Sequence, residues 1–173
     1  MLRILRQSLR IGTVTEPVPA DAELAALGAQ LRRGLDARFG RSLAIRQVDA
    51  GSCNGCELEL RALTNPYYDI ERFGVHFVAS PRHADALLVT GPVSRHMETA
   101  LRRTWQATPA PKWVIAAGSC ACDGGEFGVS YASCGAVENV LPVDLRIPGC
   151  PPSPLALIRG LLQLLASARA PAP

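Results

Sequence analysis

Three cysteine-bearing turns constrain this chain more strongly than any other feature of its sequence. Each turn follows a strand-like apolar run and has glycine close to the thiol, and together they carry Cys53 and Cys56, then Cys120, then Cys150. In an open parallel sheet, the loops that leave the carboxyl ends of the strands converge on one edge, where ligands bind. The sequence therefore predicts that four thiolates meet at one edge of such a sheet and hold one iron–sulfur cluster.

The order of apolar runs and turn signals predicts an α/β architecture. Asp21 and Ser94 are suited to capping helix N-termini, and Gly40 is suited to ending the first helix. Strand and helix signals that alternate at such short spacings predict a mostly parallel sheet with helices on both faces. We expect strands over residues 43–48, 75–78, 86–90, 113–117 and 143–147, and helices over 21–39, 57–63, 94–106 and from 153 to about 165.

The chain of 173 residues is expected to contain one domain, which we place at residues 21–165. Residues 1–20 are expected to form a basic segment and a linker, the latter at Thr15 to Pro19, and residues 166–173 a flexible tail. In the first ten residues, leucines and arginines fall on different helical faces. Such a segment could lie on an anionic membrane surface or dock to a partner, or be a frayed terminus with scattered charges. The residues concerned are Leu2, Leu5 and Leu9, and Arg3, Arg6 and Arg10.

Composition excludes several classes of function. The chain has 18 basic and 15 acidic residues, and the three arginines of the first ten residues account for the whole excess. A neutral body argues against broad nucleic-acid binding, which needs a basic face. No apolar run reaches the roughly 18 residues that a membrane span needs, and no secretory signal is recognisable. We therefore expect the six cysteines to be kept reduced and available for a metal or for catalysis.

Several interpretations of the four thiols compete. A structural zinc site also uses four thiolates, although usually as two close pairs, and here only Cys53 and Cys56 are close in sequence. A thioredoxin-like dithiol would use the same pair but would leave Cys120 and Cys150 unexplained. Unconnected buried thiols are a third possibility. An iron–sulfur cluster explains best why the cysteines stand beside glycine and proline, since glycine lets the backbone approach a cluster closely.

The cysteine motifs resemble those of a known family, the small electron-transfer subunits of membrane-bound, energy-converting nickel–iron hydrogenases. Formate hydrogenlyase belongs to that group, and the same family includes the 20 kDa subunit of respiratory complex I. The resemblance extends over about residues 43–165. The motifs that carry it are Gly51-Ser52-Cys53-Asn54-Gly55-Cys56-Glu57, Gly118-Ser119-Cys120 followed by Gly124-Gly125, and Leu141 to Pro152 around Cys150.

The resemblance implies a flavodoxin-like fold and a single 4Fe–4S cluster facing a large partner subunit. That partner would be a nickel–iron hydrogenase-type large subunit, or its 49 kDa-type homologue in complex I. A ferredoxin-like iron–sulfur subunit and membrane subunits would complete the complex, and the chain would lie peripherally on the cytoplasmic side of the inner membrane. Complex I subunits resemble one another in having two adjacent cysteines at the first motif, whereas this chain has Cys53-Asn54-Gly55-Cys56, which favours the hydrogenase branch.

Two alternatives to this function stay open. One is a complex I-like quinone reductase subunit that helps to form the quinone pocket, and the other is a non-enzymatic binding module stabilised by zinc. In either electron-transfer branch the chain alone would contain no complete active site. A long carboxyl-terminal extension and an export signal are both missing. Their absence is expected of a subunit that carries one cluster on the cytoplasmic side.

Four further residues are candidates for roles near the cluster. Cys122 lies two residues beyond Cys120, but Cys120 alone follows the Gly118-Ser119 turn, so we expect Cys120 to be the ligand and Cys122 and Cys134 to be spare thiols. Glu57 and Glu59 follow the second thiol at the expected start of a helix. They could interact only with the helix dipole, or act as carboxylates of a proton path or quinone region.

Overall fold

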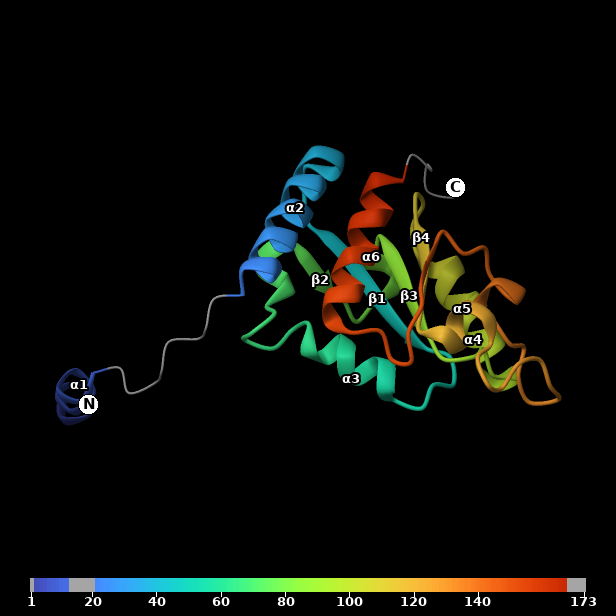
Figure 1. Ribbon diagram of the computed structural model, residues 1–173, viewed down its shortest axis with the longest axis horizontal. Helices are drawn as coiled ribbons and strands as arrows, with labels where there is room; N and C mark the ends of the chain where they lie inside the picture. Colours follow the sequence, from blue (N-terminus) through green and yellow to red (C-terminus); the bar gives the residue numbers. More distant parts are fainter. Residues whose placement is uncertain (1, 13–20, 168–173) are drawn as a thin grey trace.

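Five parallel strands form the centre of the fold, which the computed structural model describes for residues 2–12 and 21–167. Within these residues, the order across the sheet is β2-β1-β3-β4-β5, and the predicted flavodoxin-like class is confirmed by this doubly wound order (Figure 1). The strands are β1 (Leu43–Asp49), β2 (Val75–Phe77), β3 (Ala86–Thr90), β4 (Trp113–Ala117) and β5 (Leu145–Ile147).

Every residue of β3 and β4 is buried, as expected for central strands of a parallel sheet that is covered on both faces. Their register pairs Ala86 with Trp113 and Thr90 with Ala117, so the two strands end level with one another. β1 pairs with β3 and ends at Asp49 opposite Thr90. The carboxyl ends of neighbouring strands are thus aligned along one edge of the sheet.

Helices α2 (Ala22–Phe39), α3 (Gly55–Ala62) and α6 (Pro154–Ala166) cover one face. Figure 1 shows α2 and α6 lying across the same side of the sheet. The predicted caps of α2 are confirmed, because the Asp21 carboxylate accepts hydrogen bonds from the backbone N–H groups of Glu23 and Leu24, and Gly40 adopts the left-handed conformation with φ +62°. α6 begins with Ser153 as N-cap followed by proline, as its sequence predicts.

The other face is covered by α4 (Arg95–Ala107), α5 (Ser119–Asp123) and residues 134–141. Residues 134–141 include the short 3-10 turn η3 (Val137–Asn139). Two further 3-10 turns precede strands: η1 (Ile70–Phe73) precedes β2, and η2 (Pro81–His83) precedes β3. The expected loop around Cys120 is wrong in one respect, because α5 begins directly at Ser119. At five residues, α5 is too short for an apolar period to reveal it in the sequence.

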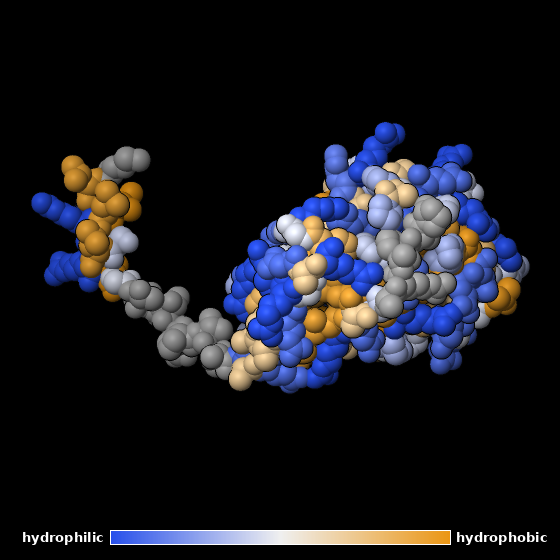
Figure 2. All heavy atoms as spheres, turned by 90° about the horizontal axis from the view of Figure 1, so that it is seen from above, coloured by the Kyte–Doolittle hydropathy of each residue, from blue (hydrophilic) through white to orange (hydrophobic). Residues whose placement is uncertain are grey.

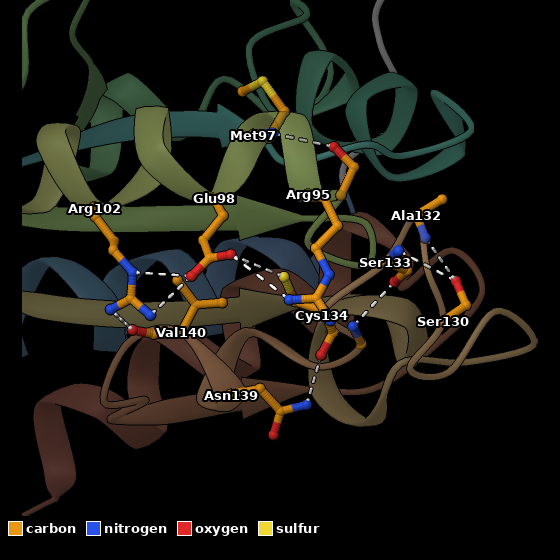
Figure 3. A network of polar contacts seen from close by, with 12 residues as sticks. Arg95, Met97, Glu98, Arg102, Ser130, Ala132, Ser133, Cys134, Asn139 and Val140 are labelled. Carbon is orange, nitrogen blue, oxygen red and sulfur yellow. Dashed lines mark hydrogen bonds and ion pairs between the residues drawn. The ribbon is translucent and has the colours of Figure 1, made fainter.

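A polar network fastens residues 130–140 to α4 (Figure 3). The Arg102 guanidinium donates to the backbone carbonyl of Val140 at 2.8 Å and pairs with the Glu98 carboxylate. The other Glu98 oxygen lies 3.4 Å from Cys134 Sγ, and the Asn139 amide donates to the Cys134 carbonyl at 2.8 Å. These contacts hold the chain that follows α5 against α4.

The structure describes most of the predicted basic segment at the amino terminus and only the start of the predicted tail at the carboxyl terminus. Residues 2–11 form α1 (Leu2–Ile11), which confirms the helical pattern of the basic segment. The expected linker at Thr15 to Pro19 lies outside the described residues, as do residues 168–173 of the expected tail, whereas Ala166 is the last residue of α6. Among residues 2–12 and 21–167, no helix combines the length and apolar character that crossing a membrane requires.

Candidate iron–sulfur site

The structure brings the four predicted cysteines together at the carboxyl edge of the sheet. Cys53, Cys56, Cys120 and Cys150 line one pocket with a volume of about 130 Å³. They follow β1, β4 and β5, and Gly91, which follows β3, also lines this pocket. Four neighbouring strands therefore contribute to a single site, as the doubly wound topology favours.

The turn after β1 is shaped by short side chain–backbone hydrogen bonds. The Asp49 carboxylate accepts from the backbone N–H groups of Gly51 and Ser52, each at 2.8 Å. Ser52 Oγ then accepts from the N–H of Asn54 at 3.0 Å, and Asn54 takes the left-handed conformation with φ +71°. As a result Cys53 stands in the turn itself, whereas Cys56 lies in the first turn of α3, which begins two residues earlier than predicted.

Glu57 connects the cysteine turn to the sheet, a role that the sequence analysis missed. Its side chain is buried at 8% exposure and accepts hydrogen bonds from the hydroxyls of Ser52 and Thr90. Thr90 is the last residue of the otherwise apolar strand β3, and this hydroxyl at a strand end was the available signal. Glu59 is half-buried on the same helix. The two carboxylates, paired in the prediction, therefore occupy different environments.

Replacing Glu57 by alanine is expected to lower the free energy of unfolding by about 2–4 kcal/mol. The substitution leaves the buried Thr90 hydroxyl without its carboxylate partner and removes a second bond from Ser52, and hydrogen bonds to charged groups contribute roughly 1.5–3 kcal/mol each. Urea unfolding of Glu57→Ala and of the exposed control Glu126→Ala measures the difference. Equal unfolding free energies in the two variants would show that Glu57 does not fasten the turn.

The segments that carry Cys120 and Cys150 are joined to each other by their backbones. Gly118 N–H donates to the Ile147 carbonyl and Ser119 N–H to the Gly149 carbonyl, each at 2.8 Å. Cys120 lies in the first turn of α5, immediately after this contact. The two thiols that are 30 positions apart in sequence are consequently fixed side by side at the pocket.

Gly118 is required at its position by both conformation and space. Its φ of +95° lies in the left-handed region that L side chains rarely adopt. A Cβ atom at this residue would lie 2.6 Å from Cys56 Sγ, which is closer than atoms can approach without displacement. The backbone of one cysteine segment thus packs directly against the thiol of another.

Burial and the proximity of the thiols disfavour negative charge in this pocket. Burial is the main cause that raises the pKa of Cys56 to about 11, and the charges of Glu57, Cys53, Cys120 and Cys150 add to it. Burial also raises the pKa of Cys120, with Cys150 and Cys53 contributing further. A compensating positive charge would therefore favour the thiolate forms of Cys56 and Cys120.

The two other cysteines lie away from the pocket. Cys122 Sγ lies 3.5 Å from the Ala116 carbonyl and faces a separate shallow surface hollow beside Asp123 and Arg146. Cys134 is buried in the α4 network shown in Figure 3. The structure thus separates Cys120 from Cys122 by position. Within the described residues, no group of three or more His, Cys, Asp or Glu side chains is arranged so that it could hold a metal ion.

Comparisons with known proteins point to one family. The family model of the 20 Kd subunit of NADH ubiquinone oxidoreductase matches residues 53–164, a range that includes all four pocket cysteines. Formate hydrogenlyase subunit 7 of Escherichia coli (strain K12) is 43% identical over 149 residues, which cover 86% of this chain and 57% of that protein. A probable membrane-bound hydrogenase subunit of Pyrococcus furiosus is 46% identical over 127 residues, covering 73% of this chain and 76% of that protein.

A solved structure shows the same fold. A chain in the structure of the membrane-bound sulfane sulfur reductase, an archaeal respiratory membrane complex, aligns with a TM-score of 0.64 at 32% sequence identity. The alignment covers 83% of this chain and 75% of that chain. This chain therefore spans most of two of these relatives, but less than two thirds of the formate hydrogenlyase subunit.

Proposed function

This chain belongs to the family of the 20 Kd subunit of NADH ubiquinone oxidoreductase, and we propose that it carries one 4Fe–4S cluster and relays electrons in a membrane-associated, hydrogenase-type complex. Its relatives are subunits of oxidoreductase complexes. The observation that carries the proposal is the single pocket lined by Cys53, Cys56, Cys120 and Cys150.

The donor set suits a cluster of this type. Four thiolates are the usual ligands of a 4Fe–4S cluster, and iron supplies the positive charge that closely spaced thiolates require. A structural zinc site usually draws its four thiolates from two close pairs. Here only Cys53 and Cys56 are close in sequence, and Cys120 and Cys150 reach the pocket from two further strand ends. This spacing supports a cluster over the alternative of a zinc-stabilised binding module.

The protein would contribute binding and positioning. When bound, a 4Fe–4S cluster accepts and donates one electron at a potential set by its surroundings. Cys53, Cys56, Cys120 and Cys150 would hold it, with Gly118 giving the backbone close access. The Glu57 contacts to Ser52 and Thr90 keep the paired cysteines in a fixed position relative to β3. A rigid site of this kind limits the reorganisation that accompanies electron transfer.

Within the family, the first motif supports the hydrogenase branch. Cys53 and Cys56 are separated by two residues, and relatives with more than 40% identity include a formate hydrogenlyase subunit and a probable membrane-bound hydrogenase subunit. In that branch, the chain would pass electrons between a large-subunit active site and a ferredoxin-like iron–sulfur subunit. The family description favours a second candidate, a complex I-like subunit that contributes to quinone binding.

Exposed large side chains in the segments that follow two of the pocket cysteines fit a subunit that is covered in a complex. Leu58 on α3 is 56% exposed, and Phe127 and Tyr131, in the segment after Cys120, are 62% and 98% exposed. Large apolar side chains that are left exposed are typical of protein interfaces. We assign this surface to the large partner subunit, and place the complex peripherally, through membrane subunits, on the cytoplasmic side of the inner membrane.

Purification of the chain in its native complex tests the proposed function. Nickel in the co-purifying large subunit, together with a cluster EPR signal that appears under hydrogen or formate, is the expected result. Bound quinone without nickel would instead favour the second candidate, a subunit of a quinone reductase. A complex in which neither donor reduces a cluster in this chain would contradict the electron-relay function.

Glu59→Gln is expected to lower turnover of the assembled complex by about tenfold if its carboxylate takes part in proton transfer, as we propose. Glu59 is half-buried and follows Cys56 on α3, so its carboxylate can exchange protons with solvent or a partner. Steady-state rates of the complex with unchanged cluster content provide the measurement. Turnover equal to that of the unmodified complex would leave Glu59 only the interaction with the helix dipole.

A further inference from the structure

All five large aliphatic side chains of helix α1 are exposed. None of its residues is buried, and the exposed fractions are 80% for Leu2, 72% for Ile4 and 84% for Leu9. Leu5 and Ile11 are also exposed. Large aliphatic side chains that are left in water at this density cost free energy, roughly 1.5–3 kcal/mol each relative to burial. Within the described residues, nothing from the rest of the chain covers them.

The apolar and basic residues of α1 are separated into two faces. At the helical period of 3.6 residues, the five aliphatic side chains and Ser8 share about half of the circumference, and the arginines and Gln7 share the other half. Figure 2 shows this division as orange atoms along one side of α1 and blue atoms on the other. The basic face consists of Arg3, Arg6 and Arg10.

All of the charge on α1 has one sign. The helix contains three arginines and no acidic residue, and these arginines account for the whole excess of 18 basic over 15 acidic residues in the chain. The remainder of the protein is neutral overall. An electrostatic attraction to a negatively charged surface would therefore be concentrated in this one helix.

We propose that α1 is a surface anchor that lies in the plane of an anionic lipid bilayer. Its aliphatic half would enter the boundary between headgroups and acyl chains, while the arginines would contact lipid phosphates at its sides. With ten residues, α1 is about 15 Å long, half of the thickness of the hydrocarbon core, so it can lie on a membrane but cannot span it. The helix precedes the residues matched by the family model and belongs to no part of the cysteine pocket.

The width and chemistry of the two faces favour lipid over a groove in a partner protein. A helix that binds a protein groove usually presents a narrow line of anchors at positions i, i+3, i+4 and i+7. In α1 the apolar residues cover about half of the circumference and are bordered by arginine, which is the pattern of interfacial helices. The charge of α1 and the width of its apolar face thus identify an anionic lipid surface as its binding partner.

Vesicle binding of the full chain tests this assignment. We expect flotation with vesicles of phosphatidylcholine containing 30% phosphatidylglycerol, and binding at least about tenfold weaker to pure phosphatidylcholine. Replacing all three arginines by glutamine is expected to reduce the affinity for anionic vesicles by roughly a hundredfold, at about fivefold per charge, whereas replacement by lysine preserves it. Raising the salt concentration should weaken binding as well.

A second set of variants tests the apolar face. Leu5→Asp combined with Leu9→Asp should abolish flotation, whereas Phe127→Asp combined with Val129→Asp makes the same chemical change on the exposed body and should not. Tryptophans added one at a time report depth against the constant background of Trp105 and Trp113. Relative to the unmodified chain, Ile4→Trp should add fluorescence that brominated lipids quench, and the fluorescence added by Gln7→Trp should not be quenched. Failure of the chain to float, equal flotation of the two aspartate pairs, or equal quenching at both positions would overturn the assignment.

The cluster and the anchor can be tested apart. Cys53→Ser removes a proposed cluster ligand and lies outside α1, so this variant should lose the cluster and still bind anionic vesicles with unchanged affinity. Vesicle binding that disappears together with the cluster would place the membrane contact elsewhere than on α1.

Discussion

Replacing Cys120 by serine is expected to remove nearly all iron and acid-labile sulfide from the purified chain, whereas replacing Cys122 by serine leaves both within about 20% of the unmodified protein. The two residues have the same chemistry and are two positions apart, but only Cys120 lines the pocket with Cys53, Cys56 and Cys150. A cluster of this type needs four ligands, and a serine oxygen is a poor substitute for a soft thiolate.

The pair of substitutions also controls for stability. Both thiols are partly buried, so a general loss of folding would lower cluster content in the two variants alike. Iron and sulfide are measured after anaerobic purification, with circular dichroism to confirm the fold. Cluster loss in Cys122→Ser together with full content in Cys120→Ser would reverse the ligand assignment.

The second large effect is expected for Gly118→Ala, which should both destabilise the protein by about 2–4 kcal/mol and prevent cluster retention. A methyl group would be forced to within 2.6 Å of Cys56 Sγ, and the φ of +95° adds strain for any residue with a Cβ. Because the crowded atom is the thiol itself, the change should affect the site more than the rest of the fold.

Gly128→Ala is the matched control for this experiment. Gly128 also has a positive φ, +52°, but a Cβ atom there meets nothing within 4 Å. The control should therefore cost only about 1–2 kcal/mol of left-handed strain and keep the cluster. If urea unfolding and iron content are the same for both alanine variants, the close packing of Gly118 against Cys56 has no functional consequence.

The strands were predictable because their runs are long, apolar and bounded by turn residues. The predicted ranges 86–90 and 113–117 match β3 and β4, and Asp21 and Gly40 cap α2 as their side chains and conformations suggest. β5 is shorter than expected, Leu145–Ile147 instead of 143–147. Once the parallel order was anticipated, the meeting of the cysteine segments followed from the position of each one after a strand.

Features that depend on tertiary contacts were not predictable in the same way. The short helix α5 has no repeating apolar pattern, and Glu57 looked equivalent to Glu59 because the sequence does not show that Thr90 ends directly opposite it. Likewise, no sequence signal shows that Gly118 of one segment would crowd Cys56 of another. The convergence of the four cysteines on one pocket was thus open to prediction, whereas the contacts that position them were not.

The central claim is tested most directly by quantifying iron, acid-labile sulfide and zinc in the chain co-expressed with its large partner and purified without oxygen, combined with EPR of the reduced sample. We expect about four iron and four sulfide atoms per chain and a signal typical of a reduced 4Fe–4S cluster. A colourless protein that contains zinc and no sulfide would contradict the account.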